Sequence, residues 1–297
     1  MILAAGLGTR LRPLTANRPK ALVPVGNEPV IERVIRYLEG QNISEIIVNA
    51  HHHHKQVVKH FEGGRPSGTP VEVRVEPEIL GTGGGIKNVA DFWGAKPFVV
   101  INGDVLTNIG LREACESHRK SGSLATLVLH DCRPFNQVQV DDHLNIVDIG
   151  VENLPGRLAF TGIHIIDPEL LNYVPEGVFQ DIIVCYRELI GSGKPIKAHI
   201  SREHYWRDMG TIKNYFLANR EALEGNPFLV GPGCRIHTSV KLREWAIIGE
   251  GAWLEDGAEV RRSILWEDVR VEKGRRVIDS VVTSAEEVVL EPTNTAF

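Results

Sequence analysis

Two glycines and two cations in the first twenty residues could hold a phosphate chain. Gly6 and Gly8 follow a short apolar run, and Arg10 and Lys20 come next. Glycines let backbone N–H groups approach phosphate oxygens closely, and the planar guanidinium of arginine suits the same oxygens. No Gly-Lys-Ser/Thr of a P-loop is present, and Leu11 stands where a dinucleotide fingerprint needs its third glycine. The segment predicts a triphosphate-binding loop of another kind.

Two aspartates could hold a divalent cation. Asp104 directly follows an apolar run and Gly103, and Asp208 precedes an expected helix that opens with Gly210 and Thr211. In open α/β sheets, ligands bind beyond the carboxyl ends of the strands. Two carboxylates there could hold one Mg²⁺, with phosphates and waters completing an octahedron. Asp208 taken alone is equally well explained as a helix N-cap.

An alternating series of strands and helices is expected to position these residues. The expected strands are 2–5, 43–49, 71–75, 98–101, 124–129 and 158–166, and the expected helices are 29–40, 86–92, 111–120, 182–190 and 211–223. Hairpin-like polar segments lie between, around 138–149. This order predicts βαβ units. We therefore expect an α/β fold: a Rossmann-like open sheet, mixed or parallel, with an irregular insertion in its second half.

Past Pro227 the pattern changes to a period of six residues. The recurring positions are Val230, Ile236, Leu242, Ile248, Leu254, Val260 and Trp266. Such a period is typical of a left-handed parallel β-helix, in which three hexads make one triangular coil and the aliphatic residues point inward. We expect two domains, 1–225 and 226–297. The second would be a contact surface for a homo-oligomer or for the first domain, outside the chemistry, with Trp245, Trp253 and Trp266 exposed.

Taken together, these motifs resemble those of the sugar-1-phosphate nucleotidyltransferases. The resemblance covers 1–225 and rests on Gly6-x-Gly8-Thr9-Arg10, Pro19-Lys20, Gly103-Asp104-Val105 and Trp206-x-Asp208-x-Gly210-Thr211. It implies an enzyme that joins a nucleoside triphosphate and a sugar 1-phosphate into a nucleotide sugar plus pyrophosphate. It also implies catalytic roles for Arg10, Lys20 and Asp104, and a Mg²⁺ held by Asp104 and Asp208. Arg10 would hold the departing pyrophosphate, and Lys20 would bridge the attacking and attacked phosphates.

The resemblance further implies two sets of binding residues. The nucleotide would contact Leu3, Ala4, Ala5, Gly6, Gly8, Thr9, Arg10, Glu76, Gly81, Thr82, Gly83 and Gly103, and the sugar would contact Glu152, Thr161 and Gly162. Glu76 would meet the base edge. Guanine and uracil both offer N–H groups to a carboxylate, so guanylyl and uridylyl transfer both stay open, as in the branch with N-acetylmuramate-1-phosphate uridylyltransferases and mannose-1-phosphate guanylyltransferases.

One position departs from the family pattern. Many relatives have Glu-Lys where this chain has Glu152-Asn153, and the lysine contacts the sugar phosphate. Either Lys20 or Arg157 supplies that charge here, or the acceptor sugar is held differently. The identity of the sugar 1-phosphate stays open.

Composition excludes several other classes. The formal net charge is −5 with dispersed basic residues, so we expect neither a nucleic acid nor a membrane as partner. The four cysteines lie far apart without a Cys-x-x-Cys, which fits a reducing cytosol, and we expect neither a signal peptide nor a membrane span.

Two rival functions are an acyltransferase using coenzyme A and a non-catalytic nucleotide-sugar sensor. Only His237 lies in the repeats as a catalytic candidate for the first. Retention of Arg10, Lys20, Asp104 and Asp208 argues against the second.

Overall fold

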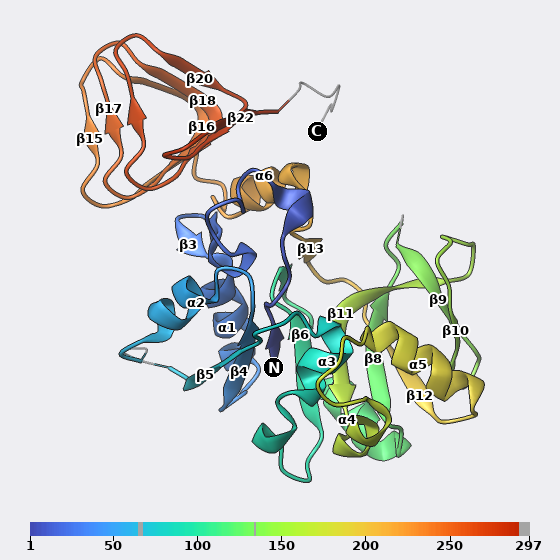
Figure 1. Ribbon diagram of the computed structural model, residues 1–297. Coiled ribbons are helices and arrows are strands. Elements are labelled where there is room, and N and C mark those ends of the chain that lie inside the picture. The colour runs from blue at the N-terminus through green and yellow to red at the C-terminus, as the bar shows by residue number, and fades with distance from the viewer. Residues whose placement is uncertain (65–67, 134, 291–297) are drawn as a thin grey trace. The chain divides into compact units, whose positions relative to one another are not determined.

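The chain folds as two compact units, each built from separate stretches of sequence. The computed structural model describes residues 1–64, 68–133 and 135–290 (Figure 1). Unit 1 comprises Met1–Leu7 and Arg33–Arg207, and unit 2 comprises Gly8–Glu32 and Asp208–Phe297. The sequence pattern places a division near residue 225, where the hexads begin. The packing groups residues 8–32, which include Arg10 and Lys20, and the last helix with the repeats.

Unit 1 is organised around one mixed sheet, which has nine strands within the described residues. The strands are β1 (Ile2–Leu3), β4 (Ile46–Ala50), β5 (Val71–Val75), β6 (Phe98–Asn102), β8 (Ala125–His130), β9 (Asn136–Val140), β10 (Ile146–Ile149), β11 (Leu158–Ile166) and β12 (Ile196–Ile200). Strands β1, β4, β5 and β6 are parallel, with β1 between β4 and β6. Strand β11 runs antiparallel to β6 and β8, and β9 and β10 form an antiparallel pair. The expected α/β fold with a parallel-rich sheet is confirmed.

Helices connect these strands and bury their apolar sides against the sheet. They are α1 (Val30–Gly40), whose first turn belongs to unit 2, α2 (His54–Phe61), α3 (Gly81–Lys87), α4 (Leu111–Ser121) and α5 (Ile182–Gly191). Shorter elements are β7 (Val105–Thr107), η3 (Ala90–Phe92), η4 (Pro168–Tyr173) and β13 (Trp206–Asp208). A continuous core joins Val100 of β6, Leu127 of β8 and Tyr186 of α5, each fully buried. Strand β8 is buried along its whole length, as its unbroken apolar run predicts.

Helix α3 begins earlier than its sequence indicates. The glycine run was expected as a loop before a helix at 86, but the helix already includes Gly81, Gly83 and Gly84. A Cβ at Gly83 would lie 3.1 Å from the carbonyl oxygen of Gln180, and one at Gly84 would lie 2.6 Å from that of Val178. Glycine is therefore needed inside this helix for close packing. The loop expectation was wrong because these partners lie almost a hundred residues away.

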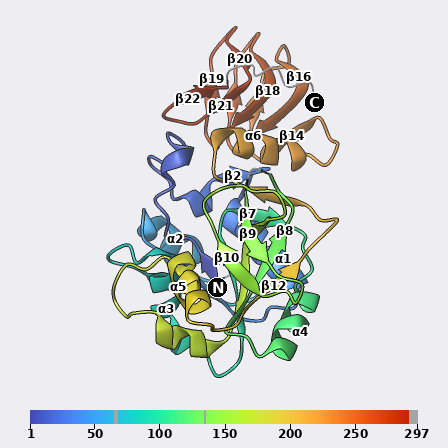
Figure 2. The ribbon, with the colours of Figure 1, turned by 90° about the vertical axis from the view of Figure 1, so that its right-hand side faces the viewer.

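Unit 2 combines the loop at 8–32 with a strand-rich C-terminal region. Its elements are η1 (Thr9–Leu11), η2 (Lys20–Leu22), β2 (Pro24–Val25), β3 (Glu28–Pro29), α6 (Ile212–Glu221), β14 (Phe228–Val230), β15 (Arg235–Ile236), β16 (Lys241–Ile248), β17 (Trp253–Leu254), β18 (Glu259–Leu265), β19 (Arg270–Val271), β20 (Arg276–Ile278), β21 (Ser280–Val282) and β22 (Glu287–Val289). We call residues 228–289 the C-terminal strand region. Its strands stack in parallel, as Leu242 pairs with Val260 and Val260 with Val277 (Figure 1). Strand β22 closes it, antiparallel to β21 (Figure 2).

The six-residue period holds through most of this region and then slips by one residue. Ile248, Leu254 and Val260 are fully buried as expected. Between β16 and β18 the register shifts after Arg243, so that Ile248 pairs with Leu265. Leu265 therefore takes the interior place one residue before the recurring position of Trp266, and the tryptophan contacts other partners.

Two of the three tryptophans expected on the surface are buried inside unit 2. Trp245 is 8% exposed and packs edge-on against Phe216 of α6, with ring centroids 4.8 Å apart. Trp266 is 6% exposed and donates its indole N–H to Tyr215 Oη at 2.9 Å. Trp253, at 41%, is the exposed one of the three. Trp245 and Trp266 are therefore buried against α6 within the chain. Among the described residues, no helix is long and apolar enough to cross a membrane.

Candidate active site

The first part of the candidate site lies where β1 and β6 end. Gly103 donates its N–H to Leu3 O at 2.9 Å, and a Cβ at Gly103 would lie 2.9 Å from that same oxygen. Only glycine allows the two strand ends to approach in this way. Asp104 follows directly, at the carboxyl edge of the sheet, where ligands of open α/β folds bind. The structure thus places Leu3, Gly103 and Asp104 together at this edge.

A buried amide links this edge to the segment that carries Glu76. Asn49, the fourth residue of β4, accepts from Ala4 N at 2.7 Å and donates to Glu76 Oε1 at 2.6 Å. The other carboxylate oxygen of Glu76 accepts from Leu80 N at 3.2 Å. Asn49 is 2% exposed and Glu76 is not exposed at all. Burial raises the pKa of Glu76, against the opposing effect of the hydrogen bond from Asn49. In this arrangement the Glu76 carboxylate fixes the start of the glycine helix.

The polar groups of the glycine run hold helix α5. Gly83 N and Gly84 N both donate to Gln180 O, at 2.8 and 3.1 Å. Thr82 Oγ1 accepts from Ile182 N at 2.9 Å. Gly81 has a φ of +71°, which only glycine adopts without strain. These bonds fix the backbone of residues 76–86, including the start of α3, so that its N–H and C=O groups could contact a ligand in a defined geometry.

The predicted sugar-side residues Thr161 and Gly162 lie at an irregularity of β11. The pairing with β8 shifts between Phe160 and His164, and Gly162 has a φ of +80°. A Cβ at Gly162 would lie 2.6 Å from Nδ2 of Asn102, the residue before Gly103. Thr161 is fully buried, and its carbonyl accepts the indole N–H of Trp206 at 2.9 Å. The bulge therefore joins the sugar-side strand, the Asp104 turn and Trp206.

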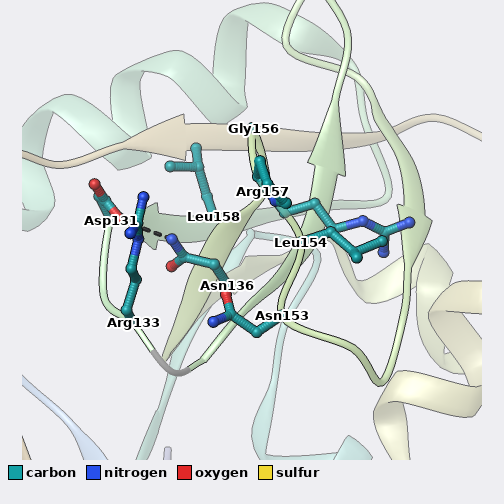
Figure 3. A pocket seen from close by; sticks show the side chains of 9 residues that line it. Asp131, Arg133, Asn136, Asn153, Leu154, Gly156, Arg157 and Leu158 are labelled. Carbon is teal, nitrogen blue, oxygen red and sulfur yellow. Dashed lines mark hydrogen bonds between the residues drawn. The ribbon is translucent and has the colours of Figure 1, made fainter.

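A cavity of about 350 Å³ opens between the end of β8 and the loop before β11 (Figure 3). Asp131, Arg133 and Asn136 line one wall, and residues 153–158 line the other. Asn136 is buried. Its side-chain amide donates to Asp131 Oδ1 at 2.6 Å and accepts from Cys132 N at 2.9 Å. The predicted sugar residue Glu152 directly precedes the second wall. The cavity is large enough for a sugar ring and carries amide groups that could bind hydroxyls.

The charge of Arg157 is already paired in this structure. Its guanidinium binds Asp148 Oδ2 at 2.6 Å and Gln137 O at 2.8 Å. In Figure 3 its side chain extends away from Arg133 and Asn136. Arg157, one of the two cations proposed to replace the missing lysine, is therefore held by structural partners within unit 1. Arg133 is the exposed cation on the cavity wall, and its place there was not predicted.

The second part of the candidate site belongs to unit 2. Gly8 has a φ of +63° and accepts from Thr15 Oγ1 at 2.8 Å, which closes the loop before η1. A Cβ at Gly210 would lie 2.6 Å from an Asp208 carboxylate oxygen and 3.1 Å from an Arg10 guanidinium nitrogen. The absence of a side chain at Gly210 thus lets both charged groups approach the backbone closely, where a Cβ would clash with the carboxylate.

The N-cap of α6 is Thr211, whose Oγ1 accepts from Asn214 N at 3.2 Å. The alternative reading of Asp208 as the cap residue is wrong, because the helix starts three residues later than that role requires.

The structure groups the predicted residues by unit. Unit 1 holds Leu3, Ala4, Ala5, Gly6, Glu76, Gly81, Thr82, Gly83, Gly103, Asp104, Glu152, Thr161 and Gly162, and unit 2 holds Gly8, Thr9, Arg10, Lys20 and Asp208. Sequence reasoning missed Asn49 and His130. Asn49 is the one polar residue in the buried strand β4, and that isolation was the available signal. His130 stacks edge-on against Trp206, and burial lowers its pKa to about 4, so it is neutral near pH 7.

Comparison with known proteins identifies the class. Residues 1–225 match the nucleotidyl transferase family, and the chain belongs to it. It is 28% identical to the UTP–glucose-1-phosphate uridylyltransferase of Synechocystis sp., over 95% of this chain and 86% of that protein. It is 27% identical to the mannose-1-phosphate guanylyltransferase of Mycobacterium tuberculosis, over 92% and 81%. The crystal structure of HddC from Yersinia pseudotuberculosis complexed with GMP-PN superposes with a TM-score of 0.65, at 26% identity, covering 74% of this chain and 97% of that one.

Proposed function

We propose that this chain is a sugar-1-phosphate nucleotidyltransferase that forms a nucleotide sugar and pyrophosphate by guanylyl or uridylyl transfer. The observation that carries the proposal is the joined edge of β1, β4 and β6, where Gly103–Asp104, Asn49 and the glycine helix are held together by short hydrogen bonds. The names of the relatives, which act on glucose 1-phosphate and mannose 1-phosphate, support the same reaction class.

The reaction needs no side-chain nucleophile, because the attacking atom is a phosphate oxygen of the acceptor. Catalysis then depends on positioning the two substrates and on neutralising the charge that develops between them. Arg10 would bind the departing pyrophosphate, and Lys20 would contact both the attacking and the attacked phosphate. Removal of one such cation typically costs about 3 kcal/mol of transition-state stabilisation, about a hundredfold in rate.

The carboxylates of Asp104 and Asp208 would hold Mg²⁺ in this proposal. Hard carboxylate oxygens are the ligands that Mg²⁺ takes from proteins, and the remaining positions are usually filled by substrate phosphates and water. Among the described residues no group of three or more His, Cys, Asp or Glu side chains could hold an ion alone, which fits a cation shared with the substrate. When bound, the ion would supply charge neutralisation at the α-phosphate.

The sugar would enter the cavity between Asn136 and residues 153–158. The side-chain amides of Asn136 and Asn153 supply donors and acceptors for hydroxyl groups. Glu152 directly precedes the second wall in sequence, and Thr161 and Gly162 lie further along β11, whose first residue, Leu158, lines the cavity. Glu76 would act on the base through the loop that it fixes, since its carboxylate is closed to solvent.

We further propose that the C-terminal strand region is a short left-handed parallel β-helix. The offset between paired residues supports it, because Leu242 pairs with Val260, three hexads away. The exposed Trp253 and the open first coil, where Val230 is 44% exposed, would serve assembly into a homo-oligomer.

A pyrophosphate-release screen tests the proposed reaction. The four nucleoside triphosphates would be paired with a panel of sugar 1-phosphates, with and without Mg²⁺. We expect Mg²⁺-dependent release with GTP or UTP. Release of no pyrophosphate from any pair, by a folded protein that still binds nucleotide sugars, would favour the sensor alternative.

A further inference from the structure

The segment around Lys20 is attached to the C-terminal strand region through Arg18. The Arg18 guanidinium forms a two-point ion pair with Glu267, one of whose contacts measures 3.2 Å. The guanidinium also lies over the ring of Trp266, 4.5 Å from its centroid. Burial opposes the charge of Glu267, but the hydrogen bonds and charge of Arg18 outweigh that effect and lower the pKa of Glu267. Glu267 is therefore ionised at neutral pH.

Trp266, the ring over which the Arg18 guanidinium lies, is itself held by a hydrogen bond to a buried residue. The indole N–H of Trp266 is bonded to Tyr215 Oη in α6, and Tyr215 is fully buried. One helical turn later, Asn219 Oδ1 accepts from Gly26 N at 3.0 Å, and it is fully buried too. Asn27 adds a bond from its side-chain amide to Ile248 O at 2.8 Å. The loop is thus fixed on both sides of Lys20.

Little flexible chain separates Arg18 from Lys20. Pro19 restricts its own φ, observed at −66°, and caps the short helix η2 that starts at Lys20. Leu22 N donates to Pro19 O at 2.9 Å, and Val23 N donates to Lys20 O at 3.2 Å. A displacement of the Arg18 side chain is therefore transmitted to the backbone of Lys20.

We infer that Arg18 is a positioning residue through which the C-terminal strand region sets the place of the Lys20 ammonium group. The inference rests on the proposed function for the role of Lys20, but the attachment itself does not. It departs from the expectation that this region stays outside the chemistry. A misplacement of about 1 Å at a catalytic group can cost a hundredfold in rate, so the attachment matters for turnover as well as for stability.

The chain contains a matched control for this contact. Arg270 lies over Trp253, 4.4 Å from the ring centroid, and pairs with Glu255 at 2.5 Å. This second Arg–Trp–Glu group has the same chemistry and lies in the same region, but it has no contact with the loop at 8–32 among the interactions of the described residues. Arg18→Ala and Arg270→Ala therefore remove the same kind of interaction, and only one of them touches the Lys20 segment.

The test measures turnover, nucleotide affinity and amide hydrogen exchange in the full-length chain. For Arg18→Ala we expect kcat to fall about tenfold or more while the Kd of the triphosphate changes little. Exchange should accelerate at the amides of 20–25. Arg270→Ala should match the wild type in kcat and in exchange of that segment. Arg18→Lys should recover part of the loss, because it keeps the charge but not the planar two-point pair. Glu267→Gln should lower kcat without deleting any packing, and adding Arg18→Ala to it should cost less than Arg18→Ala alone.

Three results would overturn the inference. Equal kcat in Arg18→Ala and Arg270→Ala is the first. A loss in Arg18→Ala that follows global unfolding, with 20–25 exchanging no faster than the rest of the chain, is the second. Unchanged amide exchange at 20–25 in Arg18→Ala, Arg18→Lys and Glu267→Gln is the third. If instead the wild type releases no pyrophosphate, the proposed function fails, and the amide exchange of 20–25 still tests whether Arg18 attaches the Lys20 segment to the C-terminal strand region.

Discussion

Gly85 is a position where a single added methyl group should disturb the joined edge of β1, β4 and β6. It lies in α3, and a Cβ there would lie 2.7 Å from Asn49 Nδ2 and 2.7 Å from Glu76 Oε1. These two atoms form the buried hydrogen bond that links β4 to the base-side loop. Neither side chain has solvent to move into, since Asn49 is 2% exposed and Glu76 is 0% exposed. Gly85→Ala must therefore separate the pair or displace the helix.

Three effects determine the size of the loss. Overpacking a close-packed site costs about 1–3 kcal/mol. Weakening a buried hydrogen bond to a carboxylate costs about 1.5–3 kcal/mol. The better helix propensity of alanine returns up to about 1 kcal/mol. The expected net loss in the free energy of unfolding is about 2–4 kcal/mol, which corresponds to about 5–15 °C in Tm.

Urea denaturation of Gly85→Ala beside Gly191→Ala checks this value. Gly191 is the last residue of α5, and nothing lies within 4 Å of a Cβ there, so its alanine variant should be as stable as the wild type or slightly more stable. Asn49→Ala should be less sensitive to the added methyl, so the two changes should combine to less than their sum. If Gly85→Ala unfolds at the same urea concentration as Gly191→Ala, the close contact argued here does not constrain the chain.

Three further predictions concern catalysis and pH. Asp104→Asn and Asp208→Asn should each lower kcat by about a hundredfold or more in a folded protein, and near-normal Mg²⁺-dependent turnover in either would remove that residue from the cation site. Lys20→Ala should lower kcat more than it weakens triphosphate binding, because its contact grows in the transition state; an unchanged kcat with a raised KM would make Lys20 a binding residue only. Glu76 has a raised pKa in the folded chain, so its protonated form stabilises the fold below the unfolded value of 4.5, and that contribution is lost as pH rises through the folded pKa. Relative to Glu76→Gln, the wild type should lose stability from acid to neutral pH in urea titrations, and a constant difference across that range would contradict the shift.

Local patterns were sufficient for most strands of the sheet, though not for β12, and for the strand end that precedes Asp104. The run 158–166 is a strand over the expected residues, and 71–75 likewise, because each is a β-rich stretch bounded by polar or turn residues. Glycine next to an aspartate after an apolar strand was a reliable sign of the Gly103–Asp104 turn, since a close backbone approach there excludes any side chain.

Contacts between distant residues explain what the patterns did not predict. Helix α3 contains glycines because residues 178–180 pack against them, and nothing near residue 83 in the sequence reveals this. A six-residue period does not include the one-residue slip between β16 and β18, so it places Trp266 at the recurring position that Leu265 takes in the structure. The link from Ala4 through Asn49 to Glu76 joins three segments, and its one local signature is that Asn49 is the single polar residue in the buried strand β4.

The position of Glu267 along the chain has a consequence for protein synthesis. Arg18 and its partner are separated by 249 residues, whereas the strand β1 just before the loop pairs with β4 and β6, which are made early. Domains form during translation from the amino end, at about 5–20 residues per second. The sheet can therefore assemble on the ribosome while the Lys20 loop still lacks its anchors. A prematurely ended chain would carry a folded sheet with an unanchored phosphate loop, so full turnover should appear only once the last strands have left the ribosome.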